Sequence, residues 1–299
     1  MRFIIVLTCL LGTVQLSLSA EDTDSTNTFT LWQLPEQTPS QMMSYVIQTA
    51  NGKVIVIDGG TKGDAPYLKG FLAALGNKVE LWIISHMHLD HVDALNELLT
   101  MKDAPEVKEI YTTLPEMSWL ETHCNIGTPG MRAPDSLSGL LEGANKKNIP
   151  IRDATMGEEF NIDGIHFKVF GIINPEITSN AVNNSSLVWR MWDDHKSVLF
   201  TGDIGVEAGN KILAGSYREA LPSDYVQMAH HGQTGASEEF YTVVNPQYCL
   251  WPTPSWLWDN NNGGGKDSGP WKTLEVRAWM NKLDIKEHYV SKDGLHKIK

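Results

Sequence analysis

One short stretch of the chain concentrates side chains that can bind metal ions. His86, His88, Asp90 and His91 follow a continuous apolar run over residues 79–85, which is typical of a strand buried on both faces. Residues i and i+2 of an extended chain project to the same side, so the first two imidazoles can bind one ion. Asp90 and His91 lie where the chain turns and can face a second ion roughly 3.5–4 Å away, a known hydrolytic arrangement. The pattern predicts a metal centre.

Two later strands also end in residues that can ligate a metal. Asp203 follows an apolar stretch at 198–200, and His230 and His231 follow another at 226–228. Because pockets form beyond the ends of strands, three strands that end in such residues predict one site at the edge of a sheet. Imidazole and carboxylate ligands suit zinc, as one or two ions, and are compatible with manganese or iron. The predicted metal-binding set is His86, His88, Asp90, His91, Asp203, His230 and His231.

The chemistry expected of this centre is hydrolysis. A bound zinc ion lowers the pKa of its water to about 7, so hydroxide is available at neutral pH. We predict that this hydroxide attacks a phosphorus or carbonyl centre. Asp90 is the expected catalytic carboxylate, which orients or deprotonates the nucleophile, and Asp58 is expected to support a ligand imidazole by a hydrogen bond.

The segments that must position these residues alternate between strands and helices. Turn sequences such as Asn51-Gly52 and Asp163-Gly164 predict hairpins, and apolar residues at helical spacing predict helices. The predicted hairpins pair residues 45–49 with 53–58, 158–162 with 165–170, 186–191 with 197–200, and 288–291 with 296–298. The predicted helices cover residues 64–76, 93–100, 136–144, 237–244 and 271–283, and a long surface loop covers 115–134. Strands bracketed by helices predict stacked sheets with helices outside.

The first residues of the chain have the pattern of a secretory signal peptide. A basic residue precedes an apolar run from Ile4 to Leu11, and small residues lie at positions 17 and 19, where signal peptidase recognises its site. A membrane anchor is the alternative, but the run is shorter than the about 20 apolar residues that span a bilayer. We therefore expect a secreted or periplasmic protein without a transmembrane anchor. The predicted segments are a signal peptide over 1–19, a flexible lead-in over 20–30 and a folded domain over 31–299.

The composition limits the partners of the mature chain. The sequence has 24 Lys and Arg against 36 Asp and Glu, and loss of Arg2 with the signal peptide gives 23 − 36 = −13. Tight binding of long nucleic acid relies on neutralising phosphates, so it is not expected, and the predicted partner is a small-molecule or phosphoester substrate. Cys124 and Cys249 would form either one disulfide or two buried thiols. The sequence does not indicate an oligomeric state.

Four motifs together resemble the metallo-β-lactamase superfamily. They are the hairpin that leads to Val56-Ile57-Asp58-Gly59-Gly60, the stretch His86–His91, Thr201-Gly202-Asp203 and His230-His231-Gly232. The resemblance implies an α/β (α+β) fold, a four-layer αββα sandwich, with residues 31–299 as a hydrolase domain. Asn183–Val188 and Ser291–Gly294 further resemble the extracellular domain of DNA-internalisation competence proteins, and bacterial phosphorylcholine esterases look similar.

The resemblance also implies a role for each ligand. His86 and His88 would hold one metal, Asp90 and His91 would hold the other, and Asp203 would bridge the two.

The histidine doublet leaves a choice open. One of His230 and His231 would complete the second metal site, and the position before Gly232 fits the family pattern better. The other would lie outside the ligand shell or assist the leaving group, so His230 is a second candidate catalytic residue. Many family members carry a further histidine near Asn183, and its absence leaves the first metal site one ligand short. The possible substitutes are His123 and His166.

These features predict a secreted metal-dependent hydrolase of a phosphoester or phosphodiester. The alternatives are a β-lactam or lactone hydrolase, a nuclease, and a metal-stabilised binding module without catalytic activity. Four tryptophans are expected near the mouth of the site, either as packing or as an aromatic wall for a sugar, base or quaternary ammonium group. They are Trp251, Trp256, Trp258 and Trp271.

Overall fold

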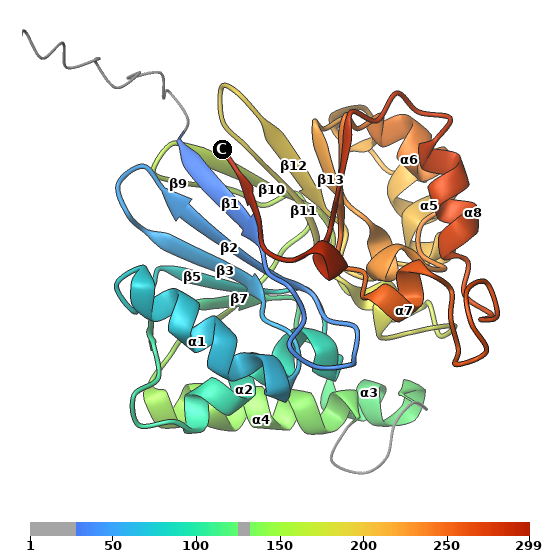
Figure 1. Cartoon of the computed structure of the whole chain (residues 1–299). Coiled ribbons are helices and arrows are strands. Elements are labelled where there is room, and N and C mark those ends of the chain that lie inside the picture. The colour runs from blue at the N-terminus through green and yellow to red at the C-terminus, as the bar shows by residue number, and fades with distance from the viewer. Residues whose placement is uncertain (1–27, 125–131) are drawn as a thin grey trace, which may run out of the picture.

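Two seven-stranded sheets pack against each other, and helices cover both outer faces (Figure 1). The computed structural model describes residues 28–124 and 132–299, so the predicted signal peptide and most of the lead-in lie outside the described residues. The architecture is a four-layer αββα sandwich, which confirms the predicted fold class.

The first sheet contains both antiparallel and parallel strands. Its strands, in spatial order, are β16 (His296–Ile298), β1 (Phe29–Gln33), β2 (Ser44–Thr49), β3 (Val54–Asp58), β5 (Leu81–Ile84), β7 (Ile110–Thr112) and β8 (Ile151–Asp153). Strands β3, β5, β7 and β8 run parallel. A separate two-stranded sheet pairs β4 (Lys78–Val79) with β6 (Glu106–Val107). The predicted strand at 79–85 is therefore divided between two sheets.

The second sheet has the corresponding arrangement. Its spatial order is β15 (Glu287–Val290), β14 (Tyr248–Trp251), β13 (Tyr225–Gln227), β12 (Ser197–Phe200), β11 (Val188–Trp192), β10 (Ile165–Gly171) and β9 (Glu159–Ile162). Strands β12 to β15 run parallel. The carboxyl ends of parallel strands lie at one edge of a sheet, which is where the predicted ligands follow β5, β12 and β13.

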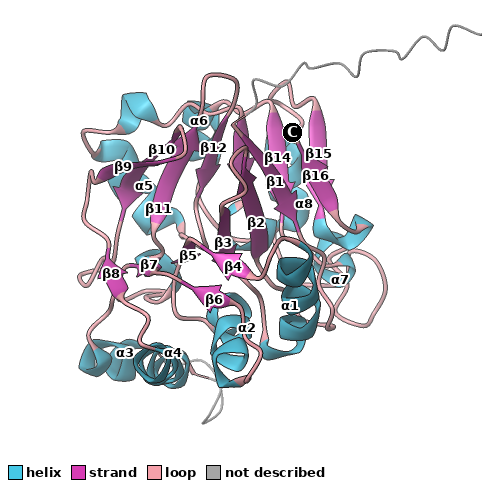
Figure 2. Cartoon of the chain, turned by 90° about the vertical axis from the view of Figure 1, so that its left-hand side faces the viewer, coloured by secondary structure: helices cyan, strands magenta, loops and turns pink. Residues whose placement is uncertain are grey.

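The helices form the two outer layers (Figures 1 and 2). On the first sheet lie α1 (Ala65–Ala74), α2 (Leu89–Thr100), α3 (Met117–His123) and α4 (Ala133–Lys147). On the second sheet lie α5 (Val206–Ala214), α6 (Glu238–Val244), α7 (Ser255–Trp258) and α8 (Thr273–Met280). No helix within residues 28–124 and 132–299 combines the length and the apolar character needed to cross a bilayer.

Alternation along the central strands builds two layers of core at once. Because successive side chains point to opposite faces of a sheet, one set packs between the sheets and the other packs under helices α1, α2 and α4. The inter-sheet set of β2 and β3 is Tyr45, Ile47, Ile55 and Ile57. The helix-facing set of the same strands is Val46, Val54 and Val56. Strands buried on both faces explain the continuous apolar runs of the sequence.

Four further sequence predictions need correction. Phe29 and Thr30 belong to β1 rather than to a flexible lead-in, because Phe29 is buried between the sheets. Helix α2 begins at Leu89 rather than at residue 93. The predicted loop at 115–134 contains helix α3, which Leu120 anchors in the core, and its residues 125–131 are not described. The predicted hairpin at 288–298 does not form, because its strands join different sheets.

The last two strands pair with different neighbours. Strand β15 pairs in parallel with β14, whereas β16 crosses to the first sheet and pairs with β1, opposing Ile298 to Leu31. Cys124 and Cys249 also lie in different clusters, the first beneath α3 and the second under the helices of the other sheet. They do not form a disulfide, in agreement with the alternative of two buried thiols.

Candidate metal centre

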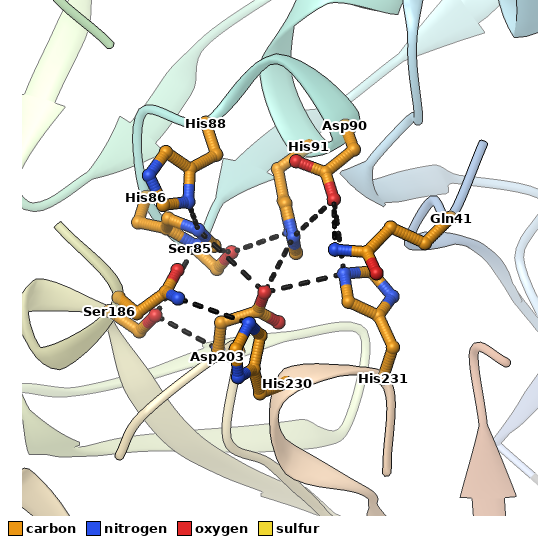
Figure 3. A network of polar contacts seen from close by, with 12 residues as sticks. Gln41, Ser85, His86, His88, Asp90, His91, Ser186, Asp203, His230 and His231 are labelled. Carbon is orange, nitrogen blue, oxygen red and sulfur yellow. Dashed lines mark hydrogen bonds and ion pairs between the residues drawn. The ribbon is translucent and has the colours of Figure 1, made fainter. Parts of the chain in front are cut away.

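The predicted ligands converge where the two sheets meet at the carboxyl ends of their parallel strands. Residues 85–91 follow β5 and enter α2, Asp203 follows β12, and His231 follows β13. Figure 3 shows their side chains pointing toward one another from separate segments. The order of strands in the two sheets thus brings together residues that are more than 100 positions apart in the sequence, such as His91 and Asp203.

Four residues form a compact buried cluster. The ligand atoms of Asp90, His91, Asp203 and His231 all lie within 4.8 Å of one another. Nε2 of His231 is 3.1 Å from Oδ2 of Asp90 and 3.3 Å from Oδ2 of Asp203, and Nε2 of His91 is 3.2 Å from that same oxygen of Asp203. Ligands placed 2.0–2.1 Å from a tetrahedral zinc ion are about 3.3 Å apart. The spacing therefore fits a single ion.

The hydrogen bonds outside the cluster fix which imidazole nitrogens face inward. Nδ1 of His91 lies 2.7 Å from Oδ2 of Asp58, and Nδ1 of His231 lies 2.9 Å from the carbonyl oxygen of Pro252. Each Nδ1–H donates to its acceptor, which leaves an Nε2 lone pair for a metal. In this neutral form both Nε2 atoms face only carboxylate oxygens, which cannot donate a hydrogen bond, and Oδ1 of Asp203 also lacks a hydrogen-bond partner. Unpartnered buried acceptors are costly, so these donors fit a metal ion.

His86 and His88 form a second group beside this cluster. Nε2 of His86 and Nδ1 of His88 are 3.0 Å apart, and Nε2 of His86 is 4.0 Å from Oδ2 of Asp203. Nδ1 of His86 lies 3.0 Å from the hydroxyl of Ser85 and 3.3 Å from that of Ser186. Burial lowers the pKa of His86 well below its ordinary value, which keeps the imidazole neutral and able to bind metal.

Charge complementarity dominates the electrostatics of the cluster. Burial would raise the pKa of Asp203, but His231 and His91 hold that pKa well below its usual range. Burial would lower the pKa of His231, but the carboxylates of Asp203 and Asp90 outweigh it and raise the pKa to about 9. Burial would also lower the pKa of His91, but the carboxylates of Asp203 and Asp58 outweigh burial and raise this pKa well above its ordinary value. A metal ion bound in this cluster would therefore displace the protons of His91 and His231.

Helix α2 supplies two of the ligands from its first turn. His88 has an extended backbone and lies just before the helix, so Asp90 and His91 are the second and third helical residues, after Leu89. The positive end of a helix dipole stabilises a carboxylate there. The sequence predicts a turn at these residues, whereas the structure places both in a helix that fixes their positions.

The histidine doublet points its two side chains in different directions. His230 and His231 both have left-handed backbones, with φ of 51° and 55°. His231 enters the buried cluster, in keeping with the family pattern, whereas His230 lies at the edge of the site. Nδ1 of His230 is 2.9 Å from the carbonyl oxygen of Thr234, and its Nε2 is 3.2 Å from Nδ2 of Asn183.

Gly232 allows this turn to pack closely. Its φ is +75°, and a Cβ atom there would lie 2.3 Å from Cε3 of Trp251. Any side chain would push the turn away from the indole ring. Thr253 also holds the turn, because its hydroxyl donates to the carbonyl oxygen of His231 at 2.6 Å.

Asn183 lies in the segment where many members of the resembling family carry a further histidine ligand. It is 3% exposed, and its Oδ1 has no hydrogen-bond partner. The two other candidates lie elsewhere: His166 is exposed on β10 and stacks on Trp192, and His123 packs against Trp119 of α3.

Three residues of the site were not predicted. Gln41 donates from Nε2 to Oδ2 of Asp90 at 3.1 Å, and Gln233 donates from Nε2 to Oε1 of Gln41 at 3.1 Å. The Ser186 hydroxyl accepts a hydrogen bond from the backbone N–H of Asp203 at 2.9 Å. Amides and hydroxyls at these positions have no spacing that distinguishes them from surface residues, so the sequence offered no means of finding them.

The tryptophans divide between packing and the rim. Trp251 is fully buried and packs edge-on against Trp258, which in turn lies under the guanidinium of Arg277. Trp256 and Trp271 are partly exposed, with ring centroids 4.7 Å apart. The packing interpretation is therefore confirmed for Trp251.

Comparison with known proteins agrees with this geometry. The model of the metallo-beta-lactamase superfamily matches residues 38–240, more than half of the chain. The chain belongs to this superfamily. Among solved structures it is similar to the metallo-beta-lactamase fold protein YhfI from Bacillus subtilis, at 11% identity and a TM-score of 0.55, covering 90% of this chain and all of that one. The comparison with curated proteins finds no match.

A second solved structure of this fold is a diiron enzyme. CmlA, a diiron beta-hydroxylase from Streptomyces venezuelae, is 12% identical with a TM-score of 0.52 and matches over 92% of this chain and 55% of its own. Identities this low show the fold alone. As a member of the metallo-β-lactamase superfamily with a buried His and Asp cluster, the chain is a metallo-hydrolase.

Proposed function

We propose that this metallo-hydrolase is an exported phosphoesterase or phosphodiesterase that uses one or two zinc ions. The central position of Asp203 carries the proposal. Its Oδ2 lies 3.2 Å from Nε2 of His91, 3.3 Å from Nε2 of His231 and 4.0 Å from Nε2 of His86. One carboxylate oxygen thus lies between two groups of donors. A pair of ions held there would supply a water of lowered pKa and charge for the attacking and leaving oxygens of a phosphoryl displacement.

The proposed ligand sets follow the two groups. His86 and His88 would hold one ion, and Asp90, His91 and His231 would hold the other. Asp203 would contribute to both. The first ion would have two imidazoles besides the shared carboxylate, whereas the second would have three protein ligands besides it. We therefore expect the second ion to be held more tightly than the first.

Asp90 has the access that a catalytic carboxylate needs. Its side chain is 11% exposed, whereas those of His91 and Asp203 are at most 1% exposed. Its position in the first turn of α2 fixes the carboxylate at the open side of the cluster. In our proposal Asp90 orients the attacking water and accepts its proton.

His230 is proposed to act on the leaving group from the edge of the site. With Nδ1–H donated to Thr234, its Nε2 is an acceptor, and Asn183 donates to it. His230 must therefore first gain a proton at Nε2 before it can give one to a leaving oxygen. His230 would take this proton from solvent, because the proton of the attacking water goes to Asp90.

Turnover measured together with metal content tests this function. Purified protein would be analysed for bound metal and assayed with a phosphodiester, a phosphomonoester and a β-lactam, before and after chelation and re-addition of zinc. We expect zinc-dependent turnover of a phosphate ester, loss of that turnover in Asp203→Asn, and retention in Asp193→Asn. Asp193 is a matched control because it is a buried carboxylate in the β11–β12 turn, where it accepts hydrogen bonds from Thr28 and the backbone.

The other outcomes identify the alternatives. Selective turnover of the β-lactam would favour a lactamase, and cleavage confined to DNA or RNA would favour a nuclease related to the competence-protein resemblance. Metal-free protein with no turnover would leave the binding module. Export is tested separately by the mass of the protein recovered from culture medium, which should correspond to a chain that begins at Ala20.

A further inference from the structure

We propose that Gln41 is a positioning residue for Asp90, that Gln233 holds Gln41 in place, and that this pair sets how tightly the second metal ion is held. The proposal rests on the role proposed above for Asp90 as a ligand. Nε2 of Gln41 donates to Oδ2 of Asp90 at 3.1 Å, and Nε2 of Gln233 donates to Oε1 of Gln41 at 3.1 Å. Figure 3 shows the Gln41 side chain directed at the carboxylate of Asp90.

The two hydrogen bonds from Gln233 to Gln41 and from Gln41 to Asp90 form a chain that we call the relay. The chemistry of the three groups fixes the direction of both bonds. An ionised carboxylate can only accept hydrogen bonds, so the Gln41 amide must present its nitrogen to Asp90 and its oxygen to Gln233. Gln233 is 8% exposed and supplies the matching donor. If Gln233 loses that donor, the Gln41 amide is free to rotate, and Asp90 loses a fixed partner. Gln233 thus acts on Asp90 only through Gln41.

The contact falls on the oxygen of Asp90 that faces the metal cluster. That oxygen, Oδ2, is 3.1 Å from Nε2 of His231. Gln41 therefore holds the carboxylate by the atom whose position decides the ligand geometry. Partners of this kind typically change metal affinity by about 10–100-fold when they are removed.

The backbone around Gln41 is fastened on both sides. Gln41 lies in the connection between β1 and β2, which runs toward α7 at the rim of the site (Figure 1). Trp256 donates from its indole to the carbonyl oxygen of Pro39 at 3.0 Å, and the Met43 N–H donates to the carbonyl oxygen of Asp90 at 3.1 Å. Because the loop is held at both points, little backbone entropy opposes the side-chain contact.

Methionine substitutions separate this relay from a general loss of structure. Gln41→Met removes the donor to Asp90 while keeping an uncharged side chain of similar length. Gln233→Met removes only the outer donor. Gln37→Met is the matched control, because Gln37 lies in the same connection with an exposed side chain whose amide donates to Pro35. Zinc affinity is measured for each purified protein by competition with a chelator, after circular dichroism has verified that the metal-free form is folded.

The relay predicts a specific order of effects. Gln41→Met should weaken binding of the tighter zinc ion by about 10–100-fold, Gln233→Met should weaken it less, and Gln37→Met should stay within about twofold of the original chain. The double variant Gln41→Met/Gln233→Met should be no weaker than Gln41→Met alone, because residues in one network are not additive. Gln41→Leu takes the place of Gln41→Met if the latter fails to fold.

Three results would overturn the relay. They are a zinc affinity for Gln41→Met within twofold of the original chain, a double variant whose loss equals the sum of the single losses, and an equal loss in the Gln37→Met control. A chain that binds zinc but cleaves no phosphate ester contradicts the proposed substrate and leaves the relay measurable. A chain that binds no zinc contradicts both proposals.

Discussion

Replacing Asp58 with asparagine tests whether His91 presents its Nε2 to a metal. Asp58 is fully buried; its Oδ1 accepts the Ser85 N–H at 2.6 Å, and its Oδ2 contacts the Ser85 hydroxyl at 2.8 Å and Nδ1 of His91 at 2.7 Å. Burial raises the pKa of Asp58, while the His91 imidazole and the Ser85 donors offset part of that rise. The carboxylate accepts from every one of these neighbours.

An asparagine side chain has only one accepting oxygen. The backbone N–H of Ser85 cannot move its proton, so the asparagine oxygen should stay there and its NH₂ group should face His91. Nδ1 of His91 would then have to accept, and the imidazole proton would move to Nε2, which points into the cluster. A hydrogen bond to a charged group contributes about 1.5–3 kcal/mol. At about 1.4 kcal/mol per factor of ten, zinc affinity should fall by about 10–100-fold.

Chelator competition at neutral pH measures this loss directly. Asp193→Asn serves as the control, because it also removes a buried carboxylate but lies in the β11–β12 turn. The control should keep the zinc affinity of the original chain even if its thermal stability falls. An Asp58→Asn affinity within twofold of the original chain would refute the reasoning, since His91 would then need no help from Asp58 to bind the ion.

Three further predictions follow from the same geometry. Zinc binding to the metal-free protein at pH 7 should release about two protons. The raised pKa values of His91 and His231 keep both imidazoles protonated, and metal ligands must be deprotonated. Calorimetry in buffers of different ionisation enthalpy counts the released protons. The metal-free protein should lose stability as pH rises from about 6.5 through about 9, the window between the unfolded and folded pKa of His231. Denaturation at several pH values measures this, and a free energy of unfolding that does not change with pH in this window would contradict the shift. Gly232→Ala should destabilise the fold by about 2–4 kcal/mol, from the strained φ and the clash with Trp251, and an unchanged unfolding midpoint would contradict it.

Local patterns predicted the elements that position the site, and long-range pairing decided the rest. The turn at Asn51-Gly52 predicted the β2–β3 hairpin, and the buried run before His86 predicted a strand there. The partner of β16 could not be predicted, because Ile298 lies opposite Leu31 at the other end of the chain. Nothing in the residues between β15 and β16 distinguishes a hairpin turn from a crossing between sheets.

The ligands could be predicted better than the residues that support them. His86, His88 and His91 are conspicuous because three imidazoles within six residues are rare, and Asp203 follows a buried strand. Gln41 reaches the site from 49 residues away through a loop, and its amide has no chemistry that marks it in advance. Side chains that act through hydrogen bonds to ligands become visible only after the backbone has brought the segments together.

The backbone at the histidine doublet explains why a strained turn persists in this fold. Two consecutive residues, His230 and His231, have left-handed conformations that cost about 1–2 kcal/mol each for residues with a Cβ atom. The turn directs His231 into the buried cluster and His230 to its edge, which an ordinary helical turn of the chain would not do. Contacts of His231 with Pro252 and Thr253 hold this conformation. Strain of this kind persists only where the surroundings over-determine the backbone, and here those surroundings include the carboxylates that His231 faces.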